Sequence, residues 1–142
     1  MHFIGNMWTL FIFGDNVEDR IGRIRYVVFY ILCGIVASVS HFLIYPGSTI
    51  PALGASGAIS GVMATYMFMF PKSRIIFLVP LFFVPFFFEL SAFVYIGVWF
   101  VSQLFSGTFT LMQTQVSGIA FWAHIGGFIG GFVLHWFFKS AK

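Results

Sequence analysis

Two long stretches of this chain contain no Asp, Glu, Lys or Arg, and they constrain its fold more than any other feature. They cover residues 26–71 and 90–138. A helix needs about 20 apolar residues to cross a bilayer, so each stretch is long enough for about two spans. The whole chain is 8% charged and 60% hydrophobic, whereas about a quarter of a soluble domain is charged. The sequence therefore excludes a soluble globule and predicts a multi-pass membrane protein.

Breaks in the apolar pattern divide the chain into five spans. The polar patch at 15–25, Pro46-Gly47-Ser48 and the segment 71–74 interrupt it. The uniformly apolar runs lack the alternation of a β-barrel, so an all-α membrane bundle is expected. Pro80 and Pro85 make one straight helix unfavourable over 75–87, which we interpret as an interfacial turn. The predicted single domain covers residues 1–142, with spans at about 2–14, 26–45, 54–70, 88–105 and 118–138.

The positions of the basic residues predict the orientation in the membrane. If every predicted span crosses the membrane, the loops 15–25 and 71–74 lie on the same side of it as the C-terminus. These regions hold all seven Lys and Arg residues, whereas 46–53 and 106–117 hold none. The positive-inside rule then places the basic side in the cytoplasm. The basic residues form no stripe, so the pI of 9.3 does not indicate a nucleic-acid partner.

Ser56 and His124 are the candidates for chemistry on the outer side. Ser56 begins the third span, beside free backbone N–H groups, and His124 lies about two turns into the last span. All carboxylates fall on the cytoplasmic side, so these two residues would act as a Ser–His dyad, with His124 as the base. A lone Ser in a span could instead serve only in helix packing. A His within the membrane is costly, which favours a functional role for His124. Ala58 breaks the hydrolase elbow G-x-S-x-G, so an α/β-hydrolase is excluded.

Paired glycines on the same two spans are compatible with contact between Ser56 and His124. Gly57 and Gly61 are four residues apart, and so are Gly127 and Gly131. This spacing allows two helix backbones to approach closely, which a direct Ser–His hydrogen bond requires. Packing alone would also explain the glycines.

His2 and Asn6 are candidates for binding an oxyanion together with the backbone N–H of Ser56. They are four residues apart, on one face and at the outer end of the first span. The alternative places His2 at the membrane interface and lets Asn6 bond a neighbouring helix. We assign no function to His41 or His135. The histidines lie at different depths without acids or thiols, so neither a metal site nor a cofactor is expected.

Taken together, these segments resemble the rhomboid intramembrane serine proteases along nearly the whole chain. The resemblance implies that Ser56 is the nucleophile and His124 the general base. It also implies that His2 and Asn6 help bind the oxyanion, and that the partners are transmembrane segments of substrate proteins within the lipid bilayer. The matching segments are His2-Phe3-Ile4-Gly5-Asn6-Met7-Trp8, Gly14-Asp15-Asn16-Val17-Glu18-Asp19 with Gly22, Gly54-Ala55-Ser56-Gly57-Ala58 and Ala123-His124-Ile125-Gly126-Gly127.

Two departures from the family pattern accompany the resemblance. The family core has six spans, and this chain begins at what resembles the second, so we expect five of the six, from a start assigned late or from a fragment. Ser60 occupies a place where some members carry a Tyr that stacks on the catalytic His. The sequence names no other residue that would orient the ring of His124.

Two other functions are compatible with parts of the sequence. A non-catalytic rhomboid-like protein would bind transmembrane helices, but the resemblance implies that such relatives usually lack the Ser or the His. A channel or transporter subunit would be expected to carry a line of ionisable groups or an inverted repeat, and neither is visible. The absence of a large polar region favours a prokaryotic cell membrane.

Overall fold

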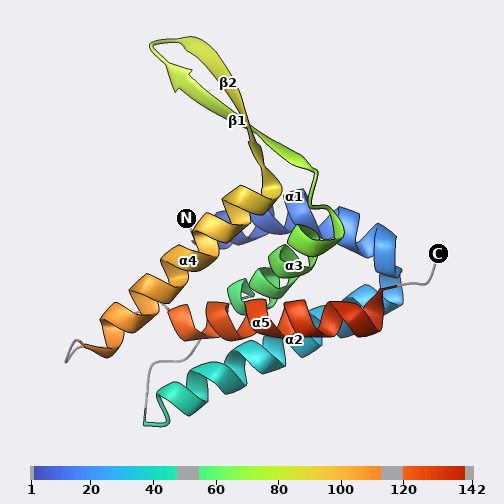
Figure 1. Ribbon diagram of the computed structural model, residues 1–142, viewed down its shortest axis with the longest axis vertical. Coiled ribbons are helices and arrows are strands. Elements are labelled where there is room, and N and C mark those ends of the chain that lie inside the picture. Colours follow the sequence, from blue (N-terminus) through green and yellow to red (C-terminus); the bar gives the residue numbers. More distant parts are fainter. Residues whose placement is uncertain (1, 48–54, 113–119, 140–142) are drawn as a thin grey trace.

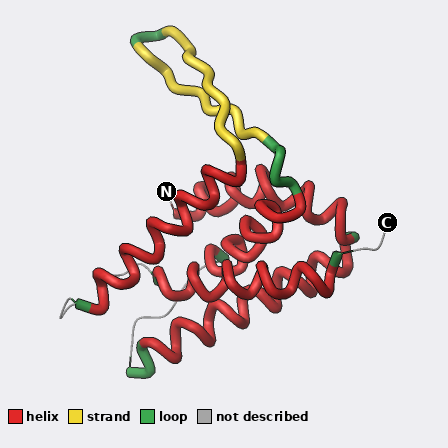
Figure 2. Tube along the Cα trace, in the orientation of Figure 1, coloured by secondary structure: helices red, strands yellow, loops and turns green. Residues whose placement is uncertain are grey.

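The structure is a computed structural model that describes residues 2–47, 55–112 and 120–139. Its elements are five helices and one β-hairpin between the third and fourth helices (Figures 1 and 2). These residues thus form a mainly helical bundle, as the sequence predicts. In chain order the elements are α1 (His2–Ile21), α2 (Arg23–Ile44), α3 (Ser56–Met69), β1 (Arg74–Leu81), β2 (Val84–Ser91), α4 (Ala92–Leu111) and α5 (Phe121–Phe138).

The short helix α3 lies at the centre of the bundle and packs against all four other helices (Figure 1). All but three of its 14 residues are buried. Its sequence contains no charged residue and many small ones, so every face can be covered by protein. Fourteen residues extend about 21 Å along a helix axis, which is less than the roughly 30 Å of a bilayer's hydrocarbon core.

Glycines allow the backbones of α3 and α5 to approach closely. A Cβ at Gly127 of α5 would collide with the carbonyl oxygen of Gly57 on α3. One turn further along both helices, a Cβ at Gly131 would collide with the carbonyl oxygen of Gly61. The contacts are those that the four-residue spacing predicts, and they bring the backbone of one helix directly against that of the other.

Three helices are long and apolar enough to cross a membrane, namely α2, α4 and α5. Helix α3 is shorter than a span, and the second half of α1 carries Asp15, Glu18, Asp19 and Arg20. The structure thus supports a multi-pass membrane protein, whereas the five-span reading stays a prediction. Many large apolar side chains on the outer faces of α2 and α4 are exposed, which suits contact with lipid.

Helix α1 continues beyond the predicted end of the first span at residue 14. It runs through the polar patch to Ile21, and Gly22 then joins it to α2 with a φ of 90°. The Gly22 N–H donates to the carbonyl of Glu18 at 2.7 Å, and the Gly22 carbonyl accepts from Tyr26 at 2.8 Å. Charged side chains at the end of a helix can remain in water. The charged residues therefore mark the end of the apolar segment, but α1 continues through them.

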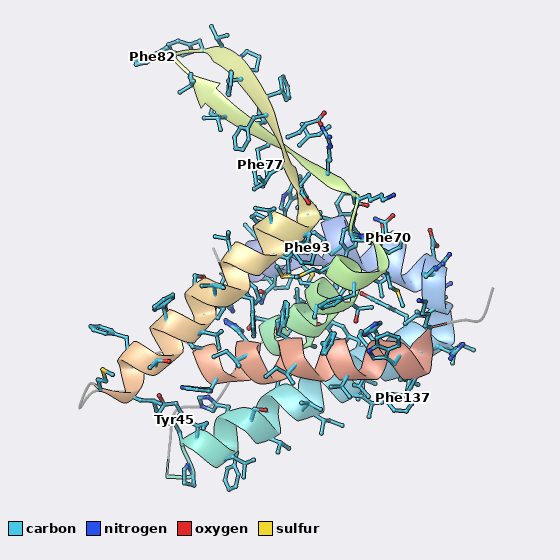
Figure 3. All side chains as sticks on the ribbon, in the orientation of Figure 1. Tyr45, Phe70, Phe77, Phe82, Phe93 and Phe137 are labelled. Carbon is cyan, nitrogen blue, oxygen red and sulfur yellow. The ribbon has the colours of Figure 1, made fainter. Side chains whose placement is uncertain are left out.

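Residues 74–91 form a β-hairpin, where the sequence analysis placed an interfacial turn and the start of the fourth span. The strands pair in register from Arg74 opposite Ser91 to Leu81 opposite Val84. Ile, Val and Phe fit extended backbone, and the two prolines disfavour a helix. Glu89 therefore lies in β2, where it pairs with Arg74 at 3.1 Å. The hairpin projects from the helices, with Phe82 at its exposed tip (Figure 3).

Candidate active site

The structure brings Ser56 and His124 into hydrogen-bonding contact. Ser56 is the first residue of α3, and His124 is the fourth residue of α5. The Ser56 Oγ lies 2.9 Å from the His124 Nε2. The His124 side chain is buried, whereas Ser56 is partly accessible. A hydroxyl and an imidazole are thus in contact at the end of the close crossing between α3 and α5.

Ser60 fixes the backbone beside this pair. Its hydroxyl is fully buried and lies 2.6 Å from the carbonyl oxygen of Gly57 and 2.9 Å from that of His124. One hydroxyl thus bridges α3 and α5 at the residue that carries the imidazole. Ser60 thus holds the main chain of His124.

The other side of the imidazole faces α4. The His124 Nδ1 lies 2.8 Å from the Gln103 Oε1. The ring of Trp99, one turn earlier on α4, lies 5.9 Å from the His124 ring at an angle of 41°. The histidine therefore contacts a hydroxyl on one nitrogen, an amide on the other, and an indole beside the ring.

Neither of these two residues of α4 is predicted as a site residue from the sequence. Trp99 and Gln103 are four residues apart, so they share one face of the helix. Gln103 also stands within a predominantly apolar predicted span, where a polar side chain is costly and needs a partner. These two signals together could have identified Gln103 as a candidate. They could not have identified His124 as its partner.

Further contacts hold α4 against the neighbouring helices near the site. The Trp122 Nε1 of α5 donates to the carbonyl oxygen of Gly107 at 3.2 Å. The rings of Phe100 and Phe128 stack with their centroids 4.1 Å apart. At the end of α2, the Tyr45 hydroxyl lies 3.4 Å from the Thr110 Oγ1 of α4 (Figure 3). Contacts on both sides of Gln103 along α4 therefore hold this helix in place relative to His124.

The predicted oxyanion residues lie on α1, which begins at His2. The His2 side chain is exposed and that of Asn6, one turn later, is half-buried. Within the described ranges no hydrogen bond joins His2 or Asn6 to Ser56 or His124. Ser56 is the first residue of α3, so its backbone N–H has no acceptor within that helix. The role of all three groups in binding an oxyanion stays a prediction.

The remaining histidines lie apart from this pair. His135 is buried three turns further along α5, where its Nδ1 contacts the carbonyl oxygen of Phe132 and its ring stacks on Phe68. His41 lies in α2 with its ring 5.5 Å from that of Tyr45. Across residues 2–47, 55–112 and 120–139, no three His, Cys, Asp or Glu side chains gather as metal ligands would.

Comparisons with known proteins connect this arrangement to one family. The model of the Rhomboid domain matches residues 1–141. The rhomboid protease GluP of Bacillus subtilis (strain 168) is 30% identical over 131 residues, which are 92% of this chain and 22% of GluP. The mitochondrial presenilin-associated rhomboid-like protein of Homo sapiens is 31% identical over 79 residues, which are 52% of this chain and 20% of that protein. The chain thus spans about a fifth of the length of these relatives. No solved structure matches it significantly.

Proposed function

Because this chain belongs to the rhomboid family, we propose that it is an intramembrane serine endopeptidase with Ser56 as the nucleophile and His124 as the general base. The observation that carries the proposal is the 2.9 Å contact between the Ser56 Oγ and the His124 Nε2. The similarity to a rhomboid protease over 92% of this chain supports it.

In the proposed reaction, the Ser56 Oγ attacks the carbonyl carbon of the scissile peptide bond and His124 takes the hydroxyl proton. The C–N bond then breaks, and His124 passes this proton to the leaving amine. The acyl group remains on Ser56 as an ester. A water molecule, deprotonated by His124, attacks the ester, and the proton returns to Ser56 as the acid product leaves.

The negative charge that develops on the carbonyl oxygen needs hydrogen-bond donors. The backbone N–H of Ser56 has no acceptor within α3, because it lies at the start of that helix, and we assign it as one such donor. We assign the side chains of His2 and Asn6 to the same oxyanion. Both lie in the first two turns of α1, and a substrate that enters beside α1 would bring its carbonyl within their reach.

The length of α3 supports cleavage below the membrane surface. A helix of about 21 Å cannot extend across a hydrocarbon core of roughly 30 Å, so at least one of its ends lies within the depth of the bilayer. We place the Ser56 end there, in a pocket that admits water from the outer side. The basic regions 15–25 and 71–74 and the C-terminus then face the cytoplasm of a prokaryotic cell.

We propose transmembrane helices as the substrates. The carbonyls of a helix are occupied by i→i−4 hydrogen bonds, so a substrate must unwind before Ser56 can attack. Segments that contain Gly, Pro or small polar residues should therefore be preferred. The measurement is the cleavage rate of matched substrates in vesicles, and equal rates for a Gly-containing and a poly-Leu segment would contradict this preference.

Labelling with a fluorophosphonate tests the catalytic roles. The purified protein in detergent is compared with Ser56→Ala and His124→Ala, and with Ser38→Ala as a control for an exposed serine on α2. We expect the wild type and Ser38→Ala to label and the other two variants not to label. An unlabelled wild type that still binds transmembrane peptides would contradict catalysis and favour a non-catalytic helix-binding protein.

A further inference from the structure

The contact between Gln103 and His124 belongs to a series of hydrogen bonds that ends at the backbone carbonyl of Trp99. The Ser102 Oγ lies 2.6 Å from the carbonyl oxygen of Trp99, and the Gln103 Nε2 lies 3.2 Å from the Ser102 Oγ. The Gln103 Oε1 then faces the His124 Nδ1 at 2.8 Å. On the far side of the imidazole, the Nε2 faces the Ser56 Oγ. The chain thus connects α4 to the candidate nucleophile.

The terminal carbonyl determines the direction of every bond in this chain. A carbonyl oxygen can only accept, so the single hydroxyl proton of Ser102 is donated to Trp99. The Ser102 oxygen is then an acceptor, and the Gln103 group beside it must be the amide NH₂. The Gln103 carbonyl is left to face His124, and it can bind only a nitrogen that carries a proton.

We propose that Gln103 is a positioning residue that holds the proton of neutral His124 on Nδ1 and leaves Nε2 free to accept the Ser56 proton. A neutral imidazole has one donor and one acceptor nitrogen. With the Nδ1 proton bound by Gln103, the lone pair of Nε2 points at Ser56. Gln103 performs, without a charge, the orienting task of the Asp in a Ser–His–Asp triad.

The neighbours of Gln103 support this role. Trp99 lies on the same face of α4 and packs beside the imidazole ring, which limits its rotation. The Trp122–Gly107 hydrogen bond holds α4 to α5 one turn beyond Gln103. Gln103 itself is half-buried, so water competes less for its carbonyl than it would on the surface.

This inference rests on the proposed function, and kinetics of substrate cleavage test it. In Gln103→Leu the Nδ1 proton loses its acceptor, so we expect kcat to fall about tenfold with little change in KM, as the loss of one such hydrogen bond implies. Thr108→Val is the control, because the Thr108 hydroxyl lies on the same helix and donates to its own Leu104 carbonyl at 2.7 Å. A Gln103→Leu variant with wild-type kcat would overturn the proposal.

Gln103→Glu separates positioning from mere packing. A carboxylate still accepts the Nδ1 proton, so activity should be retained in contrast to Gln103→Leu. Its negative charge favours the protonated imidazole, which cannot act as a base, and the acidic limb of kcat/KM should therefore move to higher pH. If both variants lose activity equally and the pH profile is unchanged, Gln103 serves only in packing and does not orient His124.

A readout that does not need activity keeps this inference distinct from the proposed function. Nitrogen-15 spectra of the imidazoles show which ring nitrogen carries the proton, and His124→Ala identifies the His124 signals among the four histidines. We expect Nδ1 to be protonated in the wild type and the proton to be distributed over both nitrogens in Gln103→Leu. Protonation on Nε2 in the wild type would overturn the inference even for an active enzyme, whereas failure of labelling at Ser56 would overturn only the catalytic roles.

Discussion

The carbonyl oxygen of Gly57 occupies the position that a Cβ on Gly127 would need. The contact lies next to the candidate dyad, since Ser56 precedes Gly57 on α3 and His124 lies one turn before Gly127 on α5. The distance between Ser56 and His124 therefore depends on a surface where the glycine backbones of the two helices meet beside the small side chain of Ser60. The same glycine contacts therefore set both the geometry of the candidate dyad and the packing at the centre of the bundle.

Gly127→Ala should move α3 and α5 apart. Overpacking of a tight interior costs about 1–3 kcal/mol, and a separation at this point would also lengthen the Ser56–His124 hydrogen bond. We expect a lower melting temperature in detergent and slower fluorophosphonate labelling. Gly97→Ala in α4 is the control, because a Cβ there would meet nothing within 4 Å. If Gly127→Ala labels as fast as Gly97→Ala, the close crossing is not needed for the dyad.

Ser60→Ala should loosen the main chain at His124 without removing a side chain from the dyad. The variant loses the hydroxyl that bridges the carbonyl oxygens of Gly57 and His124. We expect a loss of about 1 kcal/mol in stability, typical of one intramolecular hydrogen bond, together with slower labelling of Ser56. Thermal unfolding and labelling rates measure the two effects. Thr108→Val removes an exposed hydroxyl that bonds only its own helix and should change both less, so equal losses in the two variants would speak against the bridge.

Gly22→Ala should destabilise the link between α1 and α2. Gly22 has a φ of 90°, a backbone conformation that strains any residue with a Cβ. We expect a loss of about 1–2 kcal/mol in the free energy of unfolding, measured by denaturation in mixed detergent. Gly47→Ala serves as the control because its φ is not positive and no described residue lies within 4 Å of where its Cβ would be. Equal stability of the two variants would contradict the strained turn.

A double substitution at the tip of the β-hairpin, at Phe82 and Phe83, should increase the stability of the hairpin. Phe82 and Phe83 both have positive φ, 45° and 68°, in a two-residue turn. Such turns favour Asn-Gly, so Phe82→Asn with Phe83→Gly should stabilise the hairpin by about 1 kcal/mol. Slower hydrogen exchange of the amides in β1 and β2 would show it. Faster exchange than in the wild type would indicate that contacts of the two Phe side chains outweigh the turn geometry.

The candidate dyad could be found in the sequence because its members are polar residues in apolar surroundings. Ser56 stood at the start of a predicted span beside Gly57, and His124 was the histidine at a matching depth. The glycine spacing predicted that their helices could touch. The contact itself followed from the crossing of α3 and α5, and the catalytic roles remain for experiment.

Other parts of the molecule could not be predicted in this way. Helix α1 continues through Asp15 and Glu18. A polar residue marks the end of an apolar segment, but it does not mark the end of a helix. Residues 75–87 carried prolines that excluded one straight helix, but their pairing as β1 and β2 depends on hydrogen bonds between the two strands.

The sequence by itself determined that this chain belongs in a membrane and where its apolar segments begin and end, because hydropathy is a property of each segment alone. It also identified Ser56 and His124, because polar groups are costly in such segments. Only the tertiary structure decided that Gln103 meets His124 and that Ser60 binds its carbonyl. Those contacts depend on how α3, α4 and α5 rotate and cross, and the packing of all the helices together sets that geometry.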